Sequence, residues 1–191
     1  MDYLNVTKDN KFIMSEDIKY DREDLMSRTI KELKKSQIKN VKIEYKNKQF
    51  WLSFNYNDND YYFEMFLKNI TGAGWKDKPD IKRCQVSNPK NDDVDMEIIK
   101  NKKYNLILGY YCFDDNPILV AWDSYRYLNH NTIRSCYITV DTLKRGYEKG
   151  FYEGVVSSQK LWVFTGENFD KFVSRYIKYI SDLYLRSDIN G

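Results

Sequence analysis

Apolar and polar side chains alternate along much of this 191-residue chain. Residues 41–45 and 50–56 carry apolar or aromatic side chains at every second position, with Lys, Glu, Ser or Asn at most positions between them. A period of two is typical of β-strands that bury one face. Residues 57–60 (Asn-Asp-Asn-Asp) form a turn signal before the next apolar segment at 61–70. We therefore predict consecutive antiparallel strands over 41–56 and 61–70.

Short strands recur through the rest of the chain, and few segments have the period of a helix. Further strands are predicted at 81–86, 105–113, 118–122, 135–140 and 161–164. Helices are predicted to begin after Asp21 and Asp141 as N-caps, and a last helix is predicted over 167–185. This pattern favours the α+β class. The expected architecture is a mostly antiparallel β pseudobarrel with flanking N- and C-terminal helices.

The length fits a single domain over residues 1–191. Residues 1–40 are expected to form a polar lead-in and a first helix, and residues 166–186 the closing helix. We expect the chain to be a domain excised from a longer protein. Hydrophobic residues make up 42% of the chain and aromatic residues 16%, which excludes an intrinsically disordered protein.

Cysteine and histidine usage limits the possible chemistry. Cys84, Cys112 and Cys136 are an odd number without CxxC spacing, which predicts a reduced, cytoplasmic protein. The one histidine, His130, lies in no spacing typical of a Ser/His/Asp triad or a histidine zinc site. No run of 18 apolar residues predicts a membrane span. We expect no catalytic residue, metal or cofactor in this chain.

Positive charge is concentrated in two irregular segments. The whole chain has a net charge of +3, which by itself indicates no particular partner. Residues 68–83 hold five basic side chains against two acidic ones, and residues 124–134 hold two basic side chains and no acidic one. These 27 residues carry +5, so the other 164 carry −2. Such a distribution is typical either of loops that contact phosphates or of ordinary solvated loops.

Both segments also contain the side-chain types that contact DNA bases and phosphates. The candidates in or next to the first segment are Lys68, Thr71, Trp75, Lys76, Lys78, Lys82, Arg83 and Gln85. The candidates in the second segment are Ser124, Tyr125, Arg126, Tyr127, Asn129, His130, Asn131 and Arg134. Other roles stay open at this point: Arg83 and Gln85 fit an ion pair and a polar strand position, and Trp75 fits a residue that pins its loop to the sheet.

Several short motifs resemble a family of restriction-associated DNA-binding domains. They are Asn-Ile-Thr-Gly-Ala-Gly-Trp at 69–75, Arg-Cys-Gln at 83–85, Leu-Gly-Tyr at 108–110, Ala-Trp-Asp at 121–123 and Trp-Val-Phe at 162–164. Over about residues 61–180, the chain resembles the N-terminal specificity domain of LlaJI-type, McrB-related restriction proteins and related methyltransferase-associated domains. Ala73 splits two glycines that are adjacent in that family, and Cys84 stands where isoleucine is usual.

The resemblance implies a pseudobarrel like that of plant transcription-factor DNA-binding domains and of the EcoRII and BfiI effector domains. It also implies that two loop arms, about 71–80 and 124–134, grip the major groove of double-stranded DNA. The expected function is sequence-specific recognition in a restriction–modification system. Cleavage, translocation or methylation would come from an AAA+ GTPase/nuclease or methyltransferase domain or subunit.

Two alternatives stay open. Pro79-Asp80 with Glu97 and Lys100 approximates the motif of a small Mg²⁺-dependent restriction endonuclease, although the spacing of the second part is one residue too long. The other alternative is a protein-interaction module without DNA affinity, in which the Tyr-rich strands bind another subunit. Because the nuclease motif fits poorly, we expect no enzymatic activity in this chain.

Overall fold

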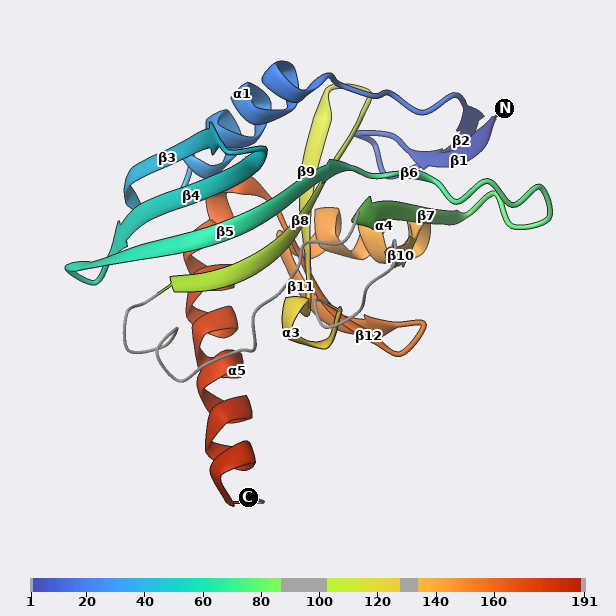
Figure 1. The fold of residues 1–191 in the computed structure, drawn as a ribbon. Helices are drawn as coiled ribbons and strands as arrows, with labels where there is room; N and C mark the ends of the chain where they lie inside the picture. Colours follow the sequence, from blue (N-terminus) through green and yellow to red (C-terminus); the bar gives the residue numbers. More distant parts are fainter. Residues whose placement is uncertain (1, 87–102, 128–133, 190–191) are drawn as a thin grey trace.

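The alternating segments form three neighbouring strands at one edge of a seven-stranded sheet (Figure 1). A computed structural model describes residues 2–86, 103–127 and 134–189. The elements in chain order are β1 (Tyr3–Val6), β2 (Phe12–Ser15), α1 (Arg22–Leu33), β3 (Lys39–Lys46), β4 (Gln49–Tyr56), β5 (Asn59–Asn69), β6 (Thr71–Gly72), β7 (Ile81–Val86), β8 (Lys103–Phe113), β9 (Asn116–Trp122), α3 (Ser124–Tyr127), β10 (Arg134–Thr139), α4 (Val140–Lys149), β11 (Phe151–Val156), β12 (Gln159–Phe164), the 3₁₀ turn η1 (Gly166–Asn168) and α5 (Phe169–Ile189).

The predicted antiparallel strands are confirmed. β3 pairs with β4 and β4 pairs with β5, both antiparallel. The β4–β5 turn holds Asn57 and Asp58 at φ of 50° and 58°. Two left-handed residues in succession match the twist of a tight hairpin, and Asn and Asp tolerate this conformation well.

The α+β class is confirmed, but the sheet is mixed. Its strand order is β11-β12-β9-β8-β5-β4-β3, and β5 and β8 are parallel. A parallel pair needs a long crossover connection. Here that connection includes β6 and β7, which join β10 in a separate three-stranded sheet of order β10-β7-β6. Over the described residues these sheets do not close into a barrel, so the predicted pseudobarrel is not confirmed.

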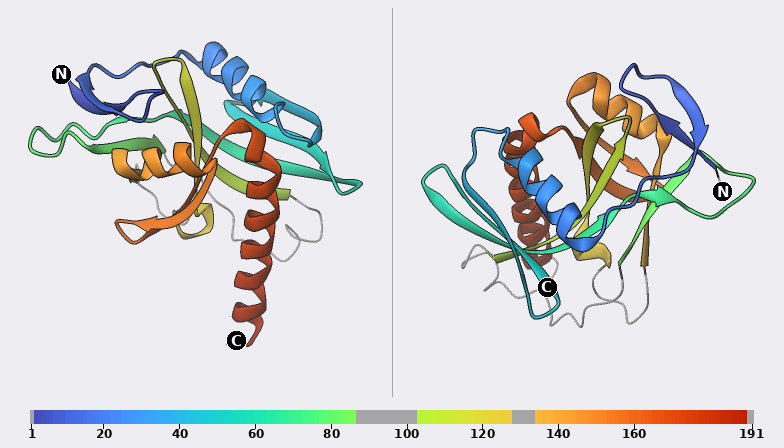
Figure 2. Two further views of the ribbon diagram at one scale, coloured as in Figure 1. Left: turned by 180° about the vertical axis from the view of Figure 1, so that it is seen from behind. Right: turned by 90° about the horizontal axis from the view of Figure 1, so that it is seen from above.

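Two hydrophobic cores lie on opposite faces of the seven-stranded sheet. The first core packs β3–β5 and β12 against α1 and α5, through side chains such as Leu25, Phe63 and Phe172. The second core packs β8, β9 and β12 against the three-stranded sheet and α4, through Trp122, Ile138 and others. The three-stranded sheet therefore has one buried and one outer face. Figure 2 shows it on the side of the large sheet opposite to α5.

Helix starts follow the expected capping chemistry with one correction. Asp21 caps α1, and its carboxylate accepts a hydrogen bond from Asp24 N at 2.9 Å. The N-cap of α4 is Thr139, two residues before the predicted Asp141, and its hydroxyl accepts from Thr142 N at 3.1 Å. Strands β1, β2, β6 and β11 were not predicted. β1 and β2 form a hairpin within the predicted polar lead-in.

Candidate nucleic-acid interface

The outer face of the three-stranded sheet brings several predicted DNA contacts together. Along β7, Lys82, Cys84 and Val86 are buried, whereas Arg83 is half-buried and Gln85 exposed. Neighbouring residues of a strand point to opposite faces. Arg83 and Gln85 therefore share the outer face, as their spacing predicted.

Strand register extends this outer face across all three strands. Arg83 lies between Thr71 of β6 and Tyr137 of β10, and Gln85 lies opposite Ser135 of β10. All three flanking residues are half-buried. Together they form one polar patch, which we name the sheet face: Thr71, Arg83, Gln85, Ser135 and Tyr137.

The first predicted arm covers about residues 71–80. Thr71 and Gly72 form β6, and residues 73–80 form a loop that projects from the body at one end of this face (Figure 1). Its base is closed by Ala73 N donating to Ile81 O at 3.0 Å. Gly74 has a φ of 86°, a left-handed conformation that glycine adopts readily. Trp75, Lys76 and Lys78 of this loop are exposed.

Trp75 joins the arm to the sheet face. Its ring stacks on Tyr137, with ring centroids 5.2 Å apart and planes at 25°. Lys78 Nζ lies 5.7 Å from the centroid of the same indole. With 40% of its surface exposed, Trp75 pins the loop through one ring face and keeps accessible surface.

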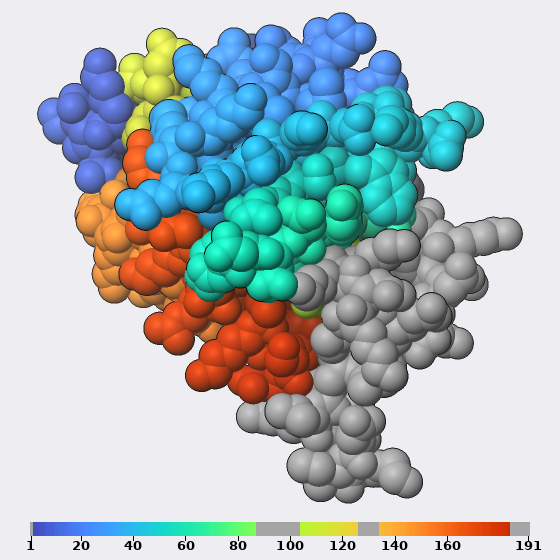
Figure 3. Space-filling view, turned by 90° about the vertical axis from the view of Figure 1, so that its left-hand side faces the viewer, coloured from blue at the N-terminus to red at the C-terminus, as the bar shows by residue number. Residues whose placement is uncertain are grey.

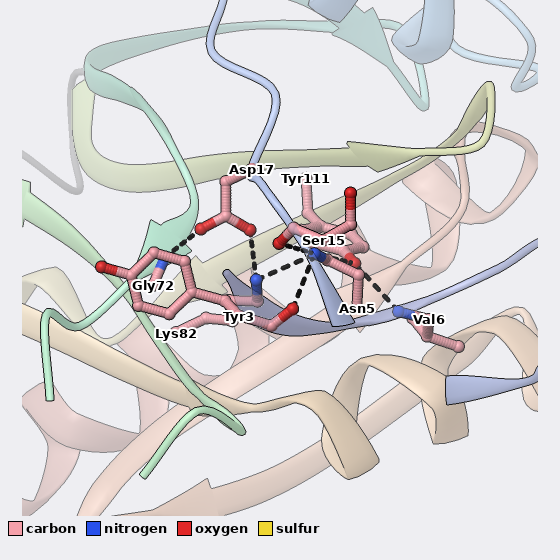
Figure 4. Close-up of polar contacts among 8 residues, drawn as sticks. All are labelled: Tyr3, Asn5, Val6, Ser15, Asp17, Gly72, Lys82 and Tyr111. Atoms are coloured by element: carbon pink, nitrogen blue, oxygen red, sulfur yellow. Dashed lines mark hydrogen bonds and ion pairs between the residues drawn. The ribbon is translucent and has the colours of Figure 1, made fainter. Parts of the chain in front are cut away.

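Lys82 corrects the sequence-based interpretation, because its side chain is fully buried and faces away from Arg83. Its ammonium group pairs with the carboxylate of Asp17 and donates to Asn5 Oδ1 at 2.8 Å (Figure 4). Burial lowers the pKa of Lys82, and the hydrogen bond and charge of Asp17 oppose that shift. Lys82 therefore does not contribute to the sheet face.

The buried ion pair belongs to a larger hydrogen-bonded cluster between the N-terminal hairpin and the sheets (Figure 4). Asp17 accepts from Gly72 N at 2.5 Å. Asn5 Oδ1 accepts from the hydroxyl of Tyr111 at 2.9 Å, and that hydroxyl accepts from Val6 N at 3.1 Å. The cluster therefore ties β1, β6, β7 and β8 together beneath the arm.

A main-chain bond also fixes the arm to the hairpin, since Leu4 N donates to Pro79 O at 3.0 Å. At the same end of the sheet, Val140 N donates to Asp80 O at 2.9 Å. Asp80 therefore lies at the fixed base of the arm. The other half of the nuclease motif, Glu97 to Lys100, lies outside the described residues.

The second predicted segment begins inside the protein. Ser124 is fully buried, and its hydroxyl contacts Asn105 O at 2.9 Å and the hydroxyl of Tyr176 at 2.7 Å. Tyr125 is half-buried against the first core. These two residues are structural rather than exposed DNA contacts, because β8 and α5 cover this end of the short helix α3.

The remaining candidates of this segment are only partly described. Arg126 and Tyr127 belong to α3, and Asn129, His130 and Asn131 lie outside the described residues. Arg134 begins β10 opposite Val86, and its Nε is buried without a partner among the described residues. Lys68 lies on β5 and is not part of the sheet face.

The β7–β10 pair places the first arm and the last residue of the second predicted arm at opposite ends of the sheet face. Ile81, which follows the first arm, pairs with Thr139, whereas Val86 pairs with Arg134, the last residue of the second. Six residues at about 3.3 Å each separate the two ends by about 17 Å.

Sequence reasoning missed Ser135 and Tyr137, which complete the sheet face. The alternating pattern of 135–140 predicted the strand but not which strand it joins. Main-chain contacts explain its position, because the side chain of Gln159 bonds Tyr137 N and Ser135 O at 2.8 and 3.2 Å. Trp122 Nε1 also donates to Tyr137 O at 3.1 Å.

The described residues also bear on the cysteines, on metal ligands and on membrane spans. Cys84, Cys112 and Cys136 are free and buried, and burial raises the pKa of the Cys84 thiol well above its usual range. The described residues contain no group of three or more His, Cys, Asp or Glu side chains that could hold a metal ion. They also contain no helix with the length and apolar character needed to cross a membrane.

Comparison with known proteins gives one match. No curated protein and no solved structure is significantly similar to this chain. The model of a family described as methylase-associated X1 matches residues 61–173. This segment is more than half of the chain, and it runs from β5 into α5 through the whole three-stranded sheet. The chain therefore belongs to the methylase-associated X1 family.

Proposed function

We propose that this chain is the sequence-specific DNA-recognition module of a restriction–modification system. The description of its family as methylase-associated supports that setting. The sheet face, together with the 73–80 arm that carries Lys76 and Lys78, would contact double-stranded DNA. We also propose that the chain is related to the specificity domains of LlaJI-type, McrB-related restriction proteins.

The sheet face is the observation that carries this proposal. The major groove of B-DNA is about 12 Å wide and admits a two-stranded β-ribbon. The β7–β10 pair has that form, with the 73–80 loop at one end and Arg134, the last residue of the second predicted arm, at the other. A ribbon about 17 Å long would let the arms reach phosphates on both sides while its outer face approaches the bases.

Residue chemistry supports separate roles for the strand and the arm. An arginine suits the O6 and N7 acceptors of guanine, and a glutamine suits N6 and N7 of adenine. We assign base reading to Arg83 and Gln85. We assign phosphate contacts to Lys76 and Lys78, which are exposed on the arm. Arg126, Asn129, His130 and Asn131 remain predicted contacts of the second arm.

Fluorescence anisotropy with labelled duplex DNA tests these roles, first with random sequence at low salt and then with sequences selected from the bound fraction. Arg83→Ala with Gln85→Ala should weaken binding to the selected sequence by about 1–3 kcal/mol per lost base contact, and affect random duplex much less. Lys76→Gln with Lys78→Gln should weaken binding to all duplexes and reduce the salt slope by about two.

Lys39→Gln is a matched control, because Lys39 is an exposed lysine on β3, outside the three-stranded sheet. It should leave affinity and sequence preference unchanged. The absence of any binding at low salt would refute the proposed function. Unchanged DNA binding by the variant with Arg83→Ala and Gln85→Ala would show that the sheet face does not contact DNA.

We further propose that this chain does not cleave or modify DNA itself. An AAA+ GTPase/nuclease or a methyltransferase, as an attached domain or a separate subunit, would supply that activity. The test is incubation of supercoiled plasmid with the purified chain and Mg²⁺. Nicking that is lost in Asp80→Asn would instead support the nuclease alternative.

An apolar surface favours a second candidate function, which is binding to the methyltransferase. Phe12, Ile13, Met14 and Ile18 on and after β2 are 43–50% exposed. Exposed apolar side chains clustered in one segment often mark a protein interface. Co-purification with the methyltransferase of the same system, lost in Ile13→Lys with DNA affinity unchanged, would support this function. Unchanged co-purification by that variant would refute it.

A further inference from the structure

A groove outside the sheet face combines aromatic walls with a positively charged rim. Its volume is about 590 Å³, and it lies between the start of α1, the β3–β4 turn and the end of β5. Figure 3 shows α1 and the β3–β4 hairpin side by side. Sites for small ligands have volumes of about 300–1,000 Å³.

The inner surface of the groove is apolar and aromatic. Leu25, Met65 and Leu67 line it and are buried. Tyr45 of β3 and Phe50 of β4 also line it, with ring centroids 4.9 Å apart. These two rings belong to directly opposed residues on neighbouring strands, so the strand register holds them together. Such a surface suits a flat ring.

The rim of the groove carries three cations, Arg22, Lys48 and Lys68. The guanidinium carbon of Arg22 lies 4.3 Å from the centroid of the Tyr45 ring. No aspartate or glutamate is among the described residues that line the groove. The ion pairs within the described part of the chain do not use these three cations. Their charge is therefore available to an anion.

An unpaired strand edge adds main-chain polar groups. The pairing of β4 with β5 ends at Phe50 and Met65, so the next residues of β5 have no β4 partner. Ile70 N donates to Tyr110 O at 2.9 Å, towards β8. Main-chain groups alternate in direction along a strand, so those of Leu67 face the groove. The N–H and C=O groups of Leu67 supply one hydrogen-bond donor and one acceptor for the polar edge of a bound aromatic ring.

We propose that this groove binds a small planar aromatic anion of the nucleoside monophosphate class. The ring lies against Tyr45, Phe50 and the apolar floor, and the phosphate contacts Arg22, Lys48 and Lys68. An apolar ligand alone would leave three cations unused, and inorganic phosphate alone would leave the aromatic wall unused. This site is separate from the sheet face and does not depend on the proposed DNA recognition.

Isothermal titration of the purified chain with each of the four deoxynucleoside 5′-monophosphates tests the proposal. Parallel titrations use the matching nucleosides and inorganic phosphate. We expect saturable binding of at least one monophosphate, and affinity at least about tenfold weaker for both its nucleoside and phosphate. Arg22→Gln and Lys48→Gln alter exposed residues, and each should weaken binding about threefold to tenfold. Lys39→Gln, at the other end of β3, should leave it unchanged.

A second measurement distinguishes a free nucleotide from the end of a DNA strand. Duplex DNA with 5′-phosphorylated ends should displace the bound monophosphate only if the site takes strand ends, and 5′-hydroxyl duplex should then fail to displace it. Whether or not the 5′-phosphorylated duplex displaces the monophosphate, the groove remains the binding site of the monophosphate. Absence of monophosphate binding, or binding that Arg22→Gln and Lys48→Gln leave intact, would overturn the proposal. The sheet-face variants that lose DNA binding should still bind the monophosphate, so a failure of the proposed function would not affect this test.

Discussion

At the scale of single residues, Lys82 and Arg83 show how neighbours in sequence take opposite roles. Both are basic, and both lie in a segment whose charge is typical of loops that contact phosphates or of ordinary solvated loops. Strand alternation turns Arg83 to the outer face and Lys82 into the second core, where Asp17 neutralises it. Because a buried charge costs several kcal/mol unless it is paired, Lys82 belongs to the stability of the fold.

This assignment predicts different effects for substitutions at the two positions. Lys82→Met should lower the free energy of unfolding by about 3 kcal/mol or more, because Asp17 would stay buried without its partner. Arg83→Met should change it by less than about 0.5 kcal/mol, since half-exposed strand residues contribute little. Urea denaturation of both variants measures the difference.

Asp17→Leu combined with Lys82→Met provides the control for this prediction. Replacing both partners of a buried pair by apolar side chains is often nearly neutral, so the double variant should recover most of the lost stability. Equal stability of the two single variants would contradict the assignment of Lys82 as a buried structural residue.

At the scale of elements, the N-terminal hairpin is the least expected part of the fold. Residues 1–12 contain too few apolar side chains to predict a strand, and β1 and β2 have only four residues each. Their positions come from long-range contacts, because Asn5 and Asp17 meet Lys82 and Tyr111 of distant strands. The hairpin supports the base of the 73–80 arm, although it precedes that arm by some 60 residues.

Gly72→Ala tests whether the hairpin supports the arm. A Cβ at this position would lie 2.1–2.4 Å from ring atoms of Tyr3, so the hairpin must move. We expect a loss of about 1–3 kcal/mol in the free energy of unfolding. Amide hydrogen exchange should become faster in β1 and β2 and at the base of the arm.

Gly74→Ala is the matched control for this effect. Its Cβ would meet no atom within 4 Å, but its φ of 86° makes any side chain unfavourable. It should therefore cost about 1 kcal/mol without faster exchange in the hairpin. Unchanged exchange of the hairpin amides in Gly72→Ala would show that the hairpin does not depend on this contact.

At the scale of the whole molecule, many of the 17 tyrosines contribute to folding rather than to a surface. Burial raises the pKa of Tyr20 to about 12, and it raises the pKa values of Tyr110, Tyr111, Tyr147 and Tyr176 further. These phenols stay protonated in the folded chain at pH values where they would ionise in the unfolded chain.

The protein is therefore expected to lose stability at alkaline pH. A group with a raised pKa in the folded state gives its full stabilisation below its ordinary pKa of 10.0, and this is lost as pH rises towards the folded value. Circular dichroism should show unfolding as pH rises from 10 towards 12. Tyrosinate absorbance should show the buried tyrosines ionising together with unfolding. Simple titration of all tyrosines near pH 10 in a folded chain would contradict this.

The sequence by itself determined the strands with a clear period of two, the capped helix α1 and the concentration of charge in two segments. These properties depend on residues close together in the chain, so local patterns report them. It also identified Arg83 and Gln85 as side chains of one face. The matched family segment, 61–173, overlaps most of the region in which the resemblance was seen.

Only the tertiary structure decided which strands pair and which polar residues stay accessible. The parallel β5–β8 pair, the separate sheet β10-β7-β6 and the burial of Lys82 and Ser124 all depend on contacts between distant segments. A charge count treats every basic residue of a segment alike, whereas strand direction and the partner across the core determine which of them reach solvent. The sheet face was therefore visible only in part from the sequence, because Tyr137 and Ser135 join it through strand pairing.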